Sequence, residues 1–396
     1  MSEQIGAGTI GRGPGSPRGG TWRGGTWRLL ADDGAGAAEG LALDEVLMAG
    51  YARGEPERPP TLRLYSYASH CALIGRYQNL AAEVDLAACE RTGTQVSRRP
   101  TGGGAIIMGS GQLGVACTGR VPVGQRPKEI IEALSAGLVA GLAGLGITAT
   151  FQGKNDLEAG GRKIAGLGLY VDTAGAMLFH ASVLADLDIG FMLEVLRVPA
   201  AKLADKAAAA VAERVTTVSE LTGRQHGAAA VRDVIVAGFA ATFGARLEPG
   251  TVSAAERDRA AALAGQRYAA PSWLAERSMS ADGSGSAALR TPAGLARVYL
   301  TTHGDLIKNA MVVGDFNELP PALAAMESAL RWRRLDEASV TGAVAGSGAG
   351  QALGVPDGRL AAAVLDAGRQ AGERVTAAPV RSAGSCYFPE PGSKGA

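Results

Sequence analysis

The chain has 396 residues and a net charge of +1 at pH 7, and hydrophobic residues make up 46% of it. This length allows two domains, and the near-neutral charge argues against a broad nucleic-acid-binding surface. The sequence contains no run of about 18 apolar residues that would span a membrane. Its first residues lack the basic and apolar regions of a signal peptide. We therefore expect a cytoplasmic globular protein without nucleic-acid or membrane partners.

Hydrophobic periodicity and turn residues predict most elements of the first two thirds of the chain. Residues 1–26 are rich in Gly, Arg and Pro and are expected to form a disordered tail. Helices are expected at 40–48 and 127–145 and over much of 187–245; strands are expected at 62–67, 71–74, 94–97, 105–108, 148–151, 162–165 and 177–184. The strand at 71–74 is expected to pair with 62–67. This pattern predicts an α/β protein of the α+β type, with mixed, largely antiparallel sheets and flanking helices.

A second compositional break follows. Residues 278–286 are rich in Gly and Ser, so we expect a linker over 266–288. A hairpin over 296–313 and a helix beginning at the two prolines 320–321 then predict a small α+β accessory domain at 289–388. The catalytic domain would cover 27–265, and residues 389–396 would form a second tail.

Three consecutive glycines, Gly102, Gly103 and Gly104, stand between two predicted strands and follow Arg98 and Arg99. Glycine costs backbone entropy, so such a run favours a close approach of the backbone to a ligand, or N–H groups that converge on an anion. The arginines add charge suited to a phosphate or a carboxylate. A solvated turn beside two arginines would give the same residues.

A second group of residues surrounds a predicted hairpin. Asn155 and Asp156 precede a Gly turn, Lys163 follows it, and the small residues Ala165, Gly166 and Gly168 come next. A lysine in this position is placed to enter a cleft as a point charge on phosphate or carboxylate. Asp156 would orient that lysine or bind Mg²⁺. The alternative is a turn with a solvated lysine.

Other polar residues fit structural roles as well as functional ones. His180 interrupts an apolar strand, and its pattern favours a satisfied core histidine. Cys117 is expected to be a small buried hydrophobic residue, and Lys202 and Lys206 have the spacing of a solvated helix face. The four cysteines, Cys71, Cys89, Cys117 and Cys386, lack the spacing of a zinc site or a disulfide framework.

Taken together, these residues resemble the lipoate–protein ligase family, which has the biotin/lipoate ligase fold. The matching motifs are Leu41-Ala42 with Asp44-Glu45, residues 74–79, the run 98–105, Gly111-Gln112, residues 155–157, residues 161–166, the strand 180–184, the pair Lys202 and Lys206, and residues 214–216. The C-terminal hairpin and helix are similar to the accessory domain of the longer ligases.

The resemblance implies that ATP and Mg²⁺ activate lipoate or octanoate as an acyl-adenylate. A lysine of a lipoyl-domain protein, such as the E2 subunit of a 2-oxoacid dehydrogenase or the glycine cleavage H protein, would then displace AMP. The implied catalytic residue is Lys163. ATP and the adenylate would contact Arg99, Gly102, Gly103, Gly104, Ala105, Ile106, Ile107, Asn155, Asp156 and Lys163. The acyl group would contact Arg76, Ala165, Gly166, Gly168, His180 and Ser182, and Asp156 would bind Mg²⁺.

The chain departs from the family pattern at three positions. Met108 stands where the family commonly has a histidine, Gly109 stands for an acidic residue, and Gln112 stands near a usual asparagine. Two other functions stay open. An octanoyl transferase that works without ATP would need an activated cysteine, for which Cys117 and Cys71 are the nearest candidates. A non-catalytic lipoate- or adenylate-binding protein would bind without turnover.

Overall fold

The computed structural model describes residues 22–52, 58–153, 155–197, 204–279 and 284–377, without the side chains of 204–207 and 374–377. Lys202, Cys386 and the expected tail at 389–396 lie outside the described residues, as does the side chain of Lys206. The N-terminal tail predicted at 1–26 extends too far into the chain. Trp22 is buried in the main core, and the Gly24 amide donates to the Phe243 carbonyl.

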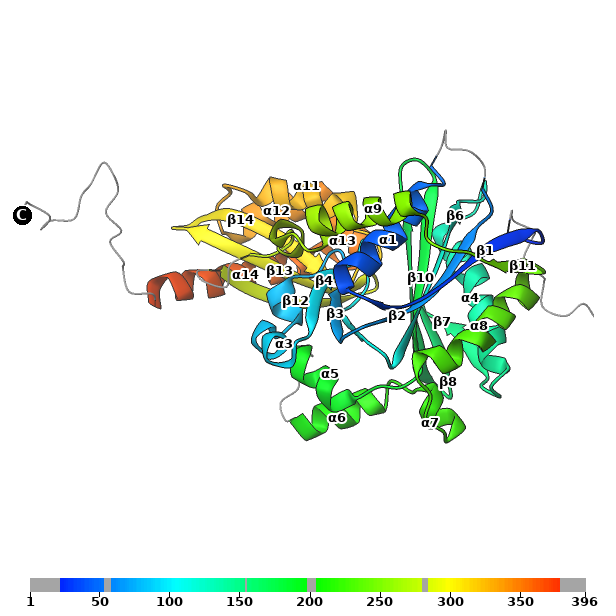
Figure 1. The fold of residues 1–396 in the computed structure, drawn as a ribbon. Helices are drawn as coiled ribbons and strands as arrows, with labels where there is room; N and C mark the ends of the chain where they lie inside the picture. The colour runs from blue at the N-terminus through cyan, green and yellow to red at the C-terminus, as the bar shows by residue number, and fades with distance from the viewer. Residues whose placement is uncertain (1–21, 53–57, 154, 198–203, 280–283, 378–396) are drawn as a thin grey trace, which may run out of the picture.

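An eight-stranded mixed sheet forms the centre of the larger body (Figure 1). Its strands, in spatial order, are β11 (Arg246–Pro249), β1 (Thr26–Ala35), β2 (Thr61–Tyr67), β6 (Gln112–Arg120), β10 (Ala176–Leu184), β9 (Arg162–Val171), β8 (Asp156–Ala159) and β7 (Ala149–Gln152). β1 pairs in parallel with β11 and β2, and every other neighbouring pair of this sheet is antiparallel. The predicted mixed, largely antiparallel sheet is therefore confirmed.

Helices cover both faces of this sheet. α4 (Pro127–Ala143) and α8 (Ala228–Phe243) pack together on one face, where a Cβ on Gly238 would lie 2.2 Å from the Gly141 amide nitrogen. This close approach explains why glycines interrupt both apolar helices. On the other face, α1 (Ala37–Ala49) packs against α9 (Ala254–Leu263) and the π-helical turn η1 (Ala264–Tyr268).

A separate three-stranded sheet supports the glycine run. It consists of β4 (Gln95–Arg98), β3 (Cys71–Ile74) and β5 (Ile106–Met108). The predicted pairing of β3 with β2 is wrong, because β1 and β6 occupy both edges of β2. Short helices complete this region: α2 (Leu80–Glu83), α3 (Leu86–Thr92), α5 (Ile189–Val195), α6 (Ala204–Ala212) and α7 (Val218–Thr222).

The C-terminal part forms a second core. β12 (Ser284–Thr291), β13 (Gly294–His303) and β14 (Leu306–Gly314) make an antiparallel sheet, covered by α11 (Pro321–Leu330), α12 (Glu337–Ser347), α13 (Ala349–Leu353) and α14 (Asp357–Ala377). The hairpin and the helix after the two prolines are confirmed. Residues expected to be linker carry structure instead, because Tyr268 and Trp273, the latter in α10 (Pro271–Leu274), are buried, and β12 starts at Ser284.

The two bodies touch at the glycine run. The Gly103 amide donates to the Phe316 carbonyl at 2.9 Å, and the Gly314 amide donates to the Tyr77 carbonyl at 3.0 Å. Arg297 and Glu83 form an ion pair at 2.9 Å. The segment after β14 therefore rests directly on the loop that the sequence singles out.

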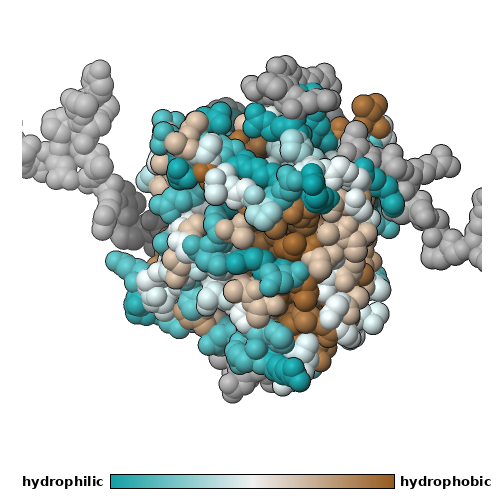
Figure 2. Space-filling model, turned by 45° about the vertical axis from the view of Figure 1, so that its right-hand side comes forward, coloured by the Kyte–Doolittle hydropathy of each residue, from teal (hydrophilic) through white to brown (hydrophobic). Residues whose placement is uncertain are grey.

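The surface is largely polar, with an apolar strip on the face in Figure 2. Apolar side chains are common on the surfaces of folded proteins, so the strip alone assigns no function. Among the described residues, no helix combines the length and the apolar character that crossing a bilayer requires.

Arg98 joins several of these segments. Its side chain is fully buried and donates to the carbonyls of Trp273, Gly75, Arg76, Gln78 and Leu274. The role expected from the sequence, a charge for a bound anion, is wrong for Arg98, because its donors are used by the backbone. Arg98 is a structural residue that fixes α10 against the end of β3.

We expect Arg98→Met to lower the free energy of unfolding by about 3 kcal/mol, because it leaves buried carbonyls without donors. Chemical denaturation would measure this. Arg91→Met removes an exposed ion pair of 3.3 Å to Glu194 and should cost less than about 1 kcal/mol. Equal effects of the two substitutions would contradict the structural role of Arg98.

Candidate active site

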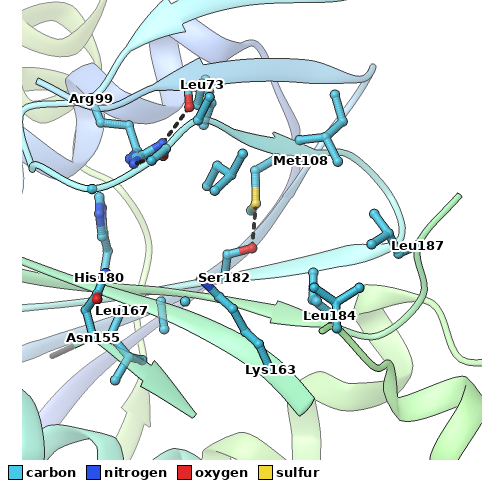
Figure 3. Close-up of a pocket in the computed structure, with 18 of the residues that line it drawn as sticks. Leu73, Arg99, Met108, Asn155, Lys163, Leu167, His180, Ser182, Leu184 and Leu187 are labelled. Atoms are coloured by element: carbon cyan, nitrogen blue, oxygen red, sulfur yellow. Dashed lines mark hydrogen bonds between the residues drawn. The ribbon is translucent and has the colours of Figure 1, made fainter. Parts of the chain in front are cut away.

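A cavity of about 210 Å³ lies between the glycine loop and strands β9 and β10. Its polar side chains lie mainly at one end, beside Leu73 and Leu167, and the other end is apolar (Figure 3). The polar side holds Arg99, Asn155 and His180, Lys163 and Ser182 lie between, and the apolar side holds Met108, Leu184 and Leu187. Such a cavity suits a ligand with an anionic head and a hydrocarbon tail.

The glycine loop is held by the side chain of Arg99. The guanidinium donates to the carbonyls of Leu73 at 2.5 Å, Gly102 at 3.2 Å and Gly104 at 2.8 Å. Gly103 has a φ of +93°, a conformation that favours glycine. A Cβ on Gly102 would lie 1.9 Å from the Phe316 carbonyl oxygen. Glycine is therefore required at 103 by backbone conformation and at 102 by close approach, whereas a Cβ on Gly104 would meet no atom within 4 Å.

Arg99 brings an unbalanced charge into the site. Its side chain is 5% exposed, and no carboxylate of the described residues forms an ion pair with it. Burial lowers the pKa of Arg99 to about 10, so the guanidinium keeps its charge at neutral pH. A buried cation without a countercharge is costly. An anion at the polar side of the cavity would supply that countercharge.

Lys163 provides the second cation. Its ammonium forms an ion pair with Asp156 at 2.7 Å, so the predicted orientation of the lysine by Asp156 is present. The backbone of Lys163 exchanges two hydrogen bonds of 2.9 Å with Arg214 and Thr216, which holds β9 at this point. A Cβ on Gly166 would approach the ammonium to 3.2 Å. Glycine at 166 therefore leaves room for the lysine to reach the cavity.

His180 fixes the start of the glycine loop. Its Nε2 lies 2.7 Å from the Thr101 hydroxyl. Burial, with a smaller contribution from the charge of Arg99, lowers the pKa of His180 to about 3. The imidazole is therefore neutral at physiological pH and acts as a hydrogen-bonding group. Gly168 serves this contact, because a Cβ there would lie 2.6 Å from Nε2.

Ser182 and Met108 mark the boundary between the two sides of the cavity. The Ser182 hydroxyl donates to the Met108 sulfur at 2.9 Å, and Met108 is buried (Figure 3). Met108, at the position that departs from the family, thus fills the middle of the cavity wall. A flexible thioether packs well against an alkyl chain.

Three residues expected to contact the acyl group lie elsewhere. Arg76 forms an ion pair with Glu276 and stacks over Trp273, with its guanidinium carbon 4.4 Å from the ring centroid. Ala165 is fully buried in the main core. Gly168 lines a neighbouring cavity instead of this one.

The sequence analysis missed most of the apolar wall. The missed residues are Leu41, Leu73, Leu184, Leu187, Met192 and Val215. Leu184 had a detectable signal, because it follows His180 and Ser182 at the two-residue period of one strand face. The others come from separate segments, and only the tertiary fold brings them together.

None of the cysteines in the described part of the chain lines the cavity. Cys71, Cys89 and Cys117 are all buried. Burial raises the pKa of Cys71 and of Cys117 to about 12, and it also raises the pKa of Cys89. These thiols are therefore protonated at neutral pH and are poor nucleophiles.

Comparison with protein families gives one match. The model of the lipoyl protein ligase A/B catalytic domain matches residues 36–240. The octanoyltransferase LipM of Symbiobacterium thermophilum is 32% identical over 271 residues, which cover 62% of this chain and 97% of that protein. Subunit 1 of lipoate-protein ligase A from Thermoplasma acidophilum is 28% identical and covers 59% of this chain and 90% of its own length.

Solved structures agree on the fold. A bipartite lipoate protein ligase of Thermoplasma acidophilum, described with its E2 lipoyl domain, has a TM-score of 0.58 and 27% identity over 65% of this chain and 99% of that chain. A lipoate-protein ligase A bound with ATP has a TM-score of 0.55 and 26% identity, over 63% and 98% of the two chains. LipL1 of P. falciparum has a TM-score of 0.61 over 81% and 94%, but at 15% identity it shows likeness of the fold alone.

The low pKa of His180 makes the stability of the fold depend on pH. Below about pH 6.5 the unfolded chain binds a proton at this residue that the folded chain does not bind, so stability falls as pH falls. Relative to His180→Gln, which stays neutral, the wild type should lose up to about 1.4 kcal/mol of unfolding free energy per pH unit between about pH 6 and pH 4. Denaturant titrations would measure both proteins, and parallel pH curves would contradict burial of a neutral His180.

Proposed function

Because the chain belongs to the lipoyl protein ligase A/B catalytic-domain family, we propose that it attaches lipoate or octanoate to a lysine of a lipoyl domain by way of an acyl-adenylate formed from ATP. Family membership gives the coarser activity, attachment of such acyl groups to proteins. The use of ATP distinguishes this proposal from acyl transfer between proteins.

The observation that carries the proposal is the set of reactive groups in the cavity. Two cations line it, and no cysteine of the described residues does. A transferase that forms an enzyme thioester needs a thiolate beside the acyl carbonyl, and the buried thiols of Cys71 and Cys117 lie outside the cavity with raised pKa values. Adenylation needs alignment and positive charge around phosphoryl oxygens. Arg99 and Lys163 supply such charge.

In the proposed first step, a carboxylate oxygen of the acid attacks the α-phosphorus of ATP and pyrophosphate leaves. The acid is already ionised at neutral pH, so no general base is needed. Arg99 orders the loop 102–107 for the nucleotide, and Asn155 lies across the cavity from the apolar wall. Lys163 then bridges the acyl oxygen and the α-phosphate. In the second step the acceptor amine attacks the acyl carbon, and AMP and a proton are released.

Roles for the remaining predicted residues follow from their places. Gly166 gives the lysine room, Ser182 lines the junction of head and tail, and His180 positions the loop through Thr101. The alkyl chain of the acid would lie along Met108 and the leucines of the apolar side.

Magnesium fits this site as an ion shared with the nucleotide. Within the described residues no cluster of three or more His, Cys, Asp or Glu side chains would hold a metal by itself. Mg²⁺ commonly binds through one or two carboxylates together with substrate phosphates. We propose that Asp156, which forms an ion pair with Lys163, would be this carboxylate, and the ion would neutralise phosphate charge.

A second function is favoured by one finding. The LipM relative from Symbiobacterium thermophilum is an octanoyltransferase, so transfer of octanoate from a carrier-protein thioester is the alternative. The acceptors in either case would be E2 lipoyl domains or the glycine cleavage H protein, and a cytoplasmic location stays a prediction.

The two functions differ in their need for ATP. With an apo lipoyl domain, Mg-ATP and lipoate or octanoate, intact-mass spectrometry should detect the acylated domain, and leaving out ATP should abolish the product. Octanoyl-acyl carrier protein without ATP should give none. Robust ATP-free octanoylation would overturn the ligase proposal.

Lys163→Ala should slow pyrophosphate release by about 10²–10³-fold, because the lysine would stabilise charge that develops as the new P–O bond forms. Lys163→Arg should recover little, since a planar guanidinium does not replace a compact ammonium. Lys308→Ala, at an exposed position of β14, is the control and should keep the wild-type rate. Near-normal pyrophosphate release by Lys163→Ala would remove this residue from the mechanism.

A further inference from the structure

Half of strand β9 has an open edge. β8 pairs with β9 only from Arg162 to Gly166, whereas β10 pairs with β9 as far as Val171. The Leu167 amide donates to the Asn155 carbonyl on the β8 side. Because strand amides alternate between the two edges, those of Leu169 and Val171 also point to the β8 side, where no described strand pairs with them.

A second cavity, of about 630 Å³, lies along this edge. It is bounded by residues 167–171, by the start of α4, and by Asn317 and Glu318 of the C-terminal body. Among the described residues that line it, the charged groups are one ammonium, Lys128, and one carboxylate, Glu318. Val171 is 38% exposed although it is a large apolar residue in a strand. An open apolar edge is a ready template for another strand.

This second cavity meets the first one at its polar side. Gly102, Asn155 and Leu167 line both cavities. A third cavity, of about 570 Å³, meets the first through Leu187 and Val215, which belong to the apolar wall. A group that must reach the acyl carboxyl beside Arg99 can therefore approach from the edge of β9.

We propose that the open edge of β9, residues 167–171, receives an extended segment of the acceptor domain by strand addition, and that the acceptor lysine enters the active site between Gly102 and Asn155. Main-chain hydrogen bonds to Leu169 and Val171 would hold the segment whatever its side chains. The carboxylate of Glu318 would attract the incoming ammonium. The identification of the acceptor domain as the occupant of this surface rests on the proposed function, the acylation of a lysine.

Hydrogen exchange of the full-length wild type tests the surface directly. Saturating apo lipoyl domain should slow exchange at the Leu169 and Val171 amides by about tenfold or more, as expected when open-edge amides become hydrogen-bonded. Unchanged exchange at both amides, or protection confined to the rim of the third cavity at 216–225, would overturn the proposal. Protection that rises with enzyme concentration alone would assign the edge to a second copy of the chain and overturn it as well.

A pair of variants tests the same edge by activity. Leu169→Pro removes the edge amide, whereas Leu169→Ala keeps it and controls for loss of the side chain. Transfer from purified octanoyl-AMP to the lipoyl domain should fall about tenfold more in the proline variant, the equivalent of one hydrogen bond of about 1.4 kcal/mol. Capture of the same acyl group by hydroxylamine should stay equal in the two variants, because a small nucleophile needs no docking edge.

These readouts separate the docking surface from the proposed chemistry. Equal transfer rates in the two variants, or an equal loss of hydroxylamine capture and transfer in Leu169→Pro, would overturn the surface while ATP-dependent adenylation stands. Protection of the β9 amides in an enzyme that forms no acyl-adenylate would support the docking surface and overturn the proposed adenylation.

Discussion

The burial of one guanidinium without a carboxylate organises the active site. Arg99 is stabilised by carbonyl oxygens of the glycine loop and of β3, which carry only partial charge. Carbonyls satisfy the donors but leave the net charge uncompensated. The net positive charge of Arg99 therefore attracts an anion to the site. Lys163 already forms an ion pair with Asp156, so it adds to this attraction only when its ammonium also contacts a ligand. Binding of a carboxylate or phosphate and stability of the loop are in this way coupled.

Close backbone approach extends this constraint to the C-terminal body. Gly102 leaves no space for a side chain beside the Phe316 carbonyl, and the Gly103 amide donates to the same oxygen. One of the loop amides that would otherwise face a ligand is thus bonded to the second body. Any shift of residues 316–317 would free that amide, so the position of the second body bears on how many donors the loop offers to phosphate.

What the sequence revealed depended on how local the signal was. The glycines, Lys163 and Asp156 are predictable because each belongs to a short run of residues with a recognisable pattern. The structure places Lys163 and the glycines on one cavity. The sequence does not distinguish Arg98 from Arg99, because adjacent residues of a strand face opposite directions and the direction depends on tertiary packing. Both guanidiniums donate to backbone carbonyls, but Arg98 is held against α10, whereas Arg99 lines the cavity. The partner of β3 was predicted wrongly because sequence proximity favoured β2, whose edges are occupied by strands from farther along the chain. The apolar wall, which joins α1, β3, β10 and α5, had no local signature.

Sequence similarity favours an octanoyltransferase, whereas the residues of the cavity favour a ligase. The two observations are compatible. Sequence similarity to an octanoyltransferase shows that the two proteins are related, and an apolar cavity wall would suit an acyl chain in either reaction. The group that activates the acyl carbon is a single local feature, a thiolate in one case and a nucleotide phosphate in the other. A shared fold does not by itself determine the reaction, so overall identity does not decide between them. In this chain Cys71, Cys89 and Cys117 are buried outside the cavity and have raised pKa values. A guanidinium without an ion-pair partner and a lysine line the cavity. The charges that line the cavity therefore support the proposed phosphate chemistry.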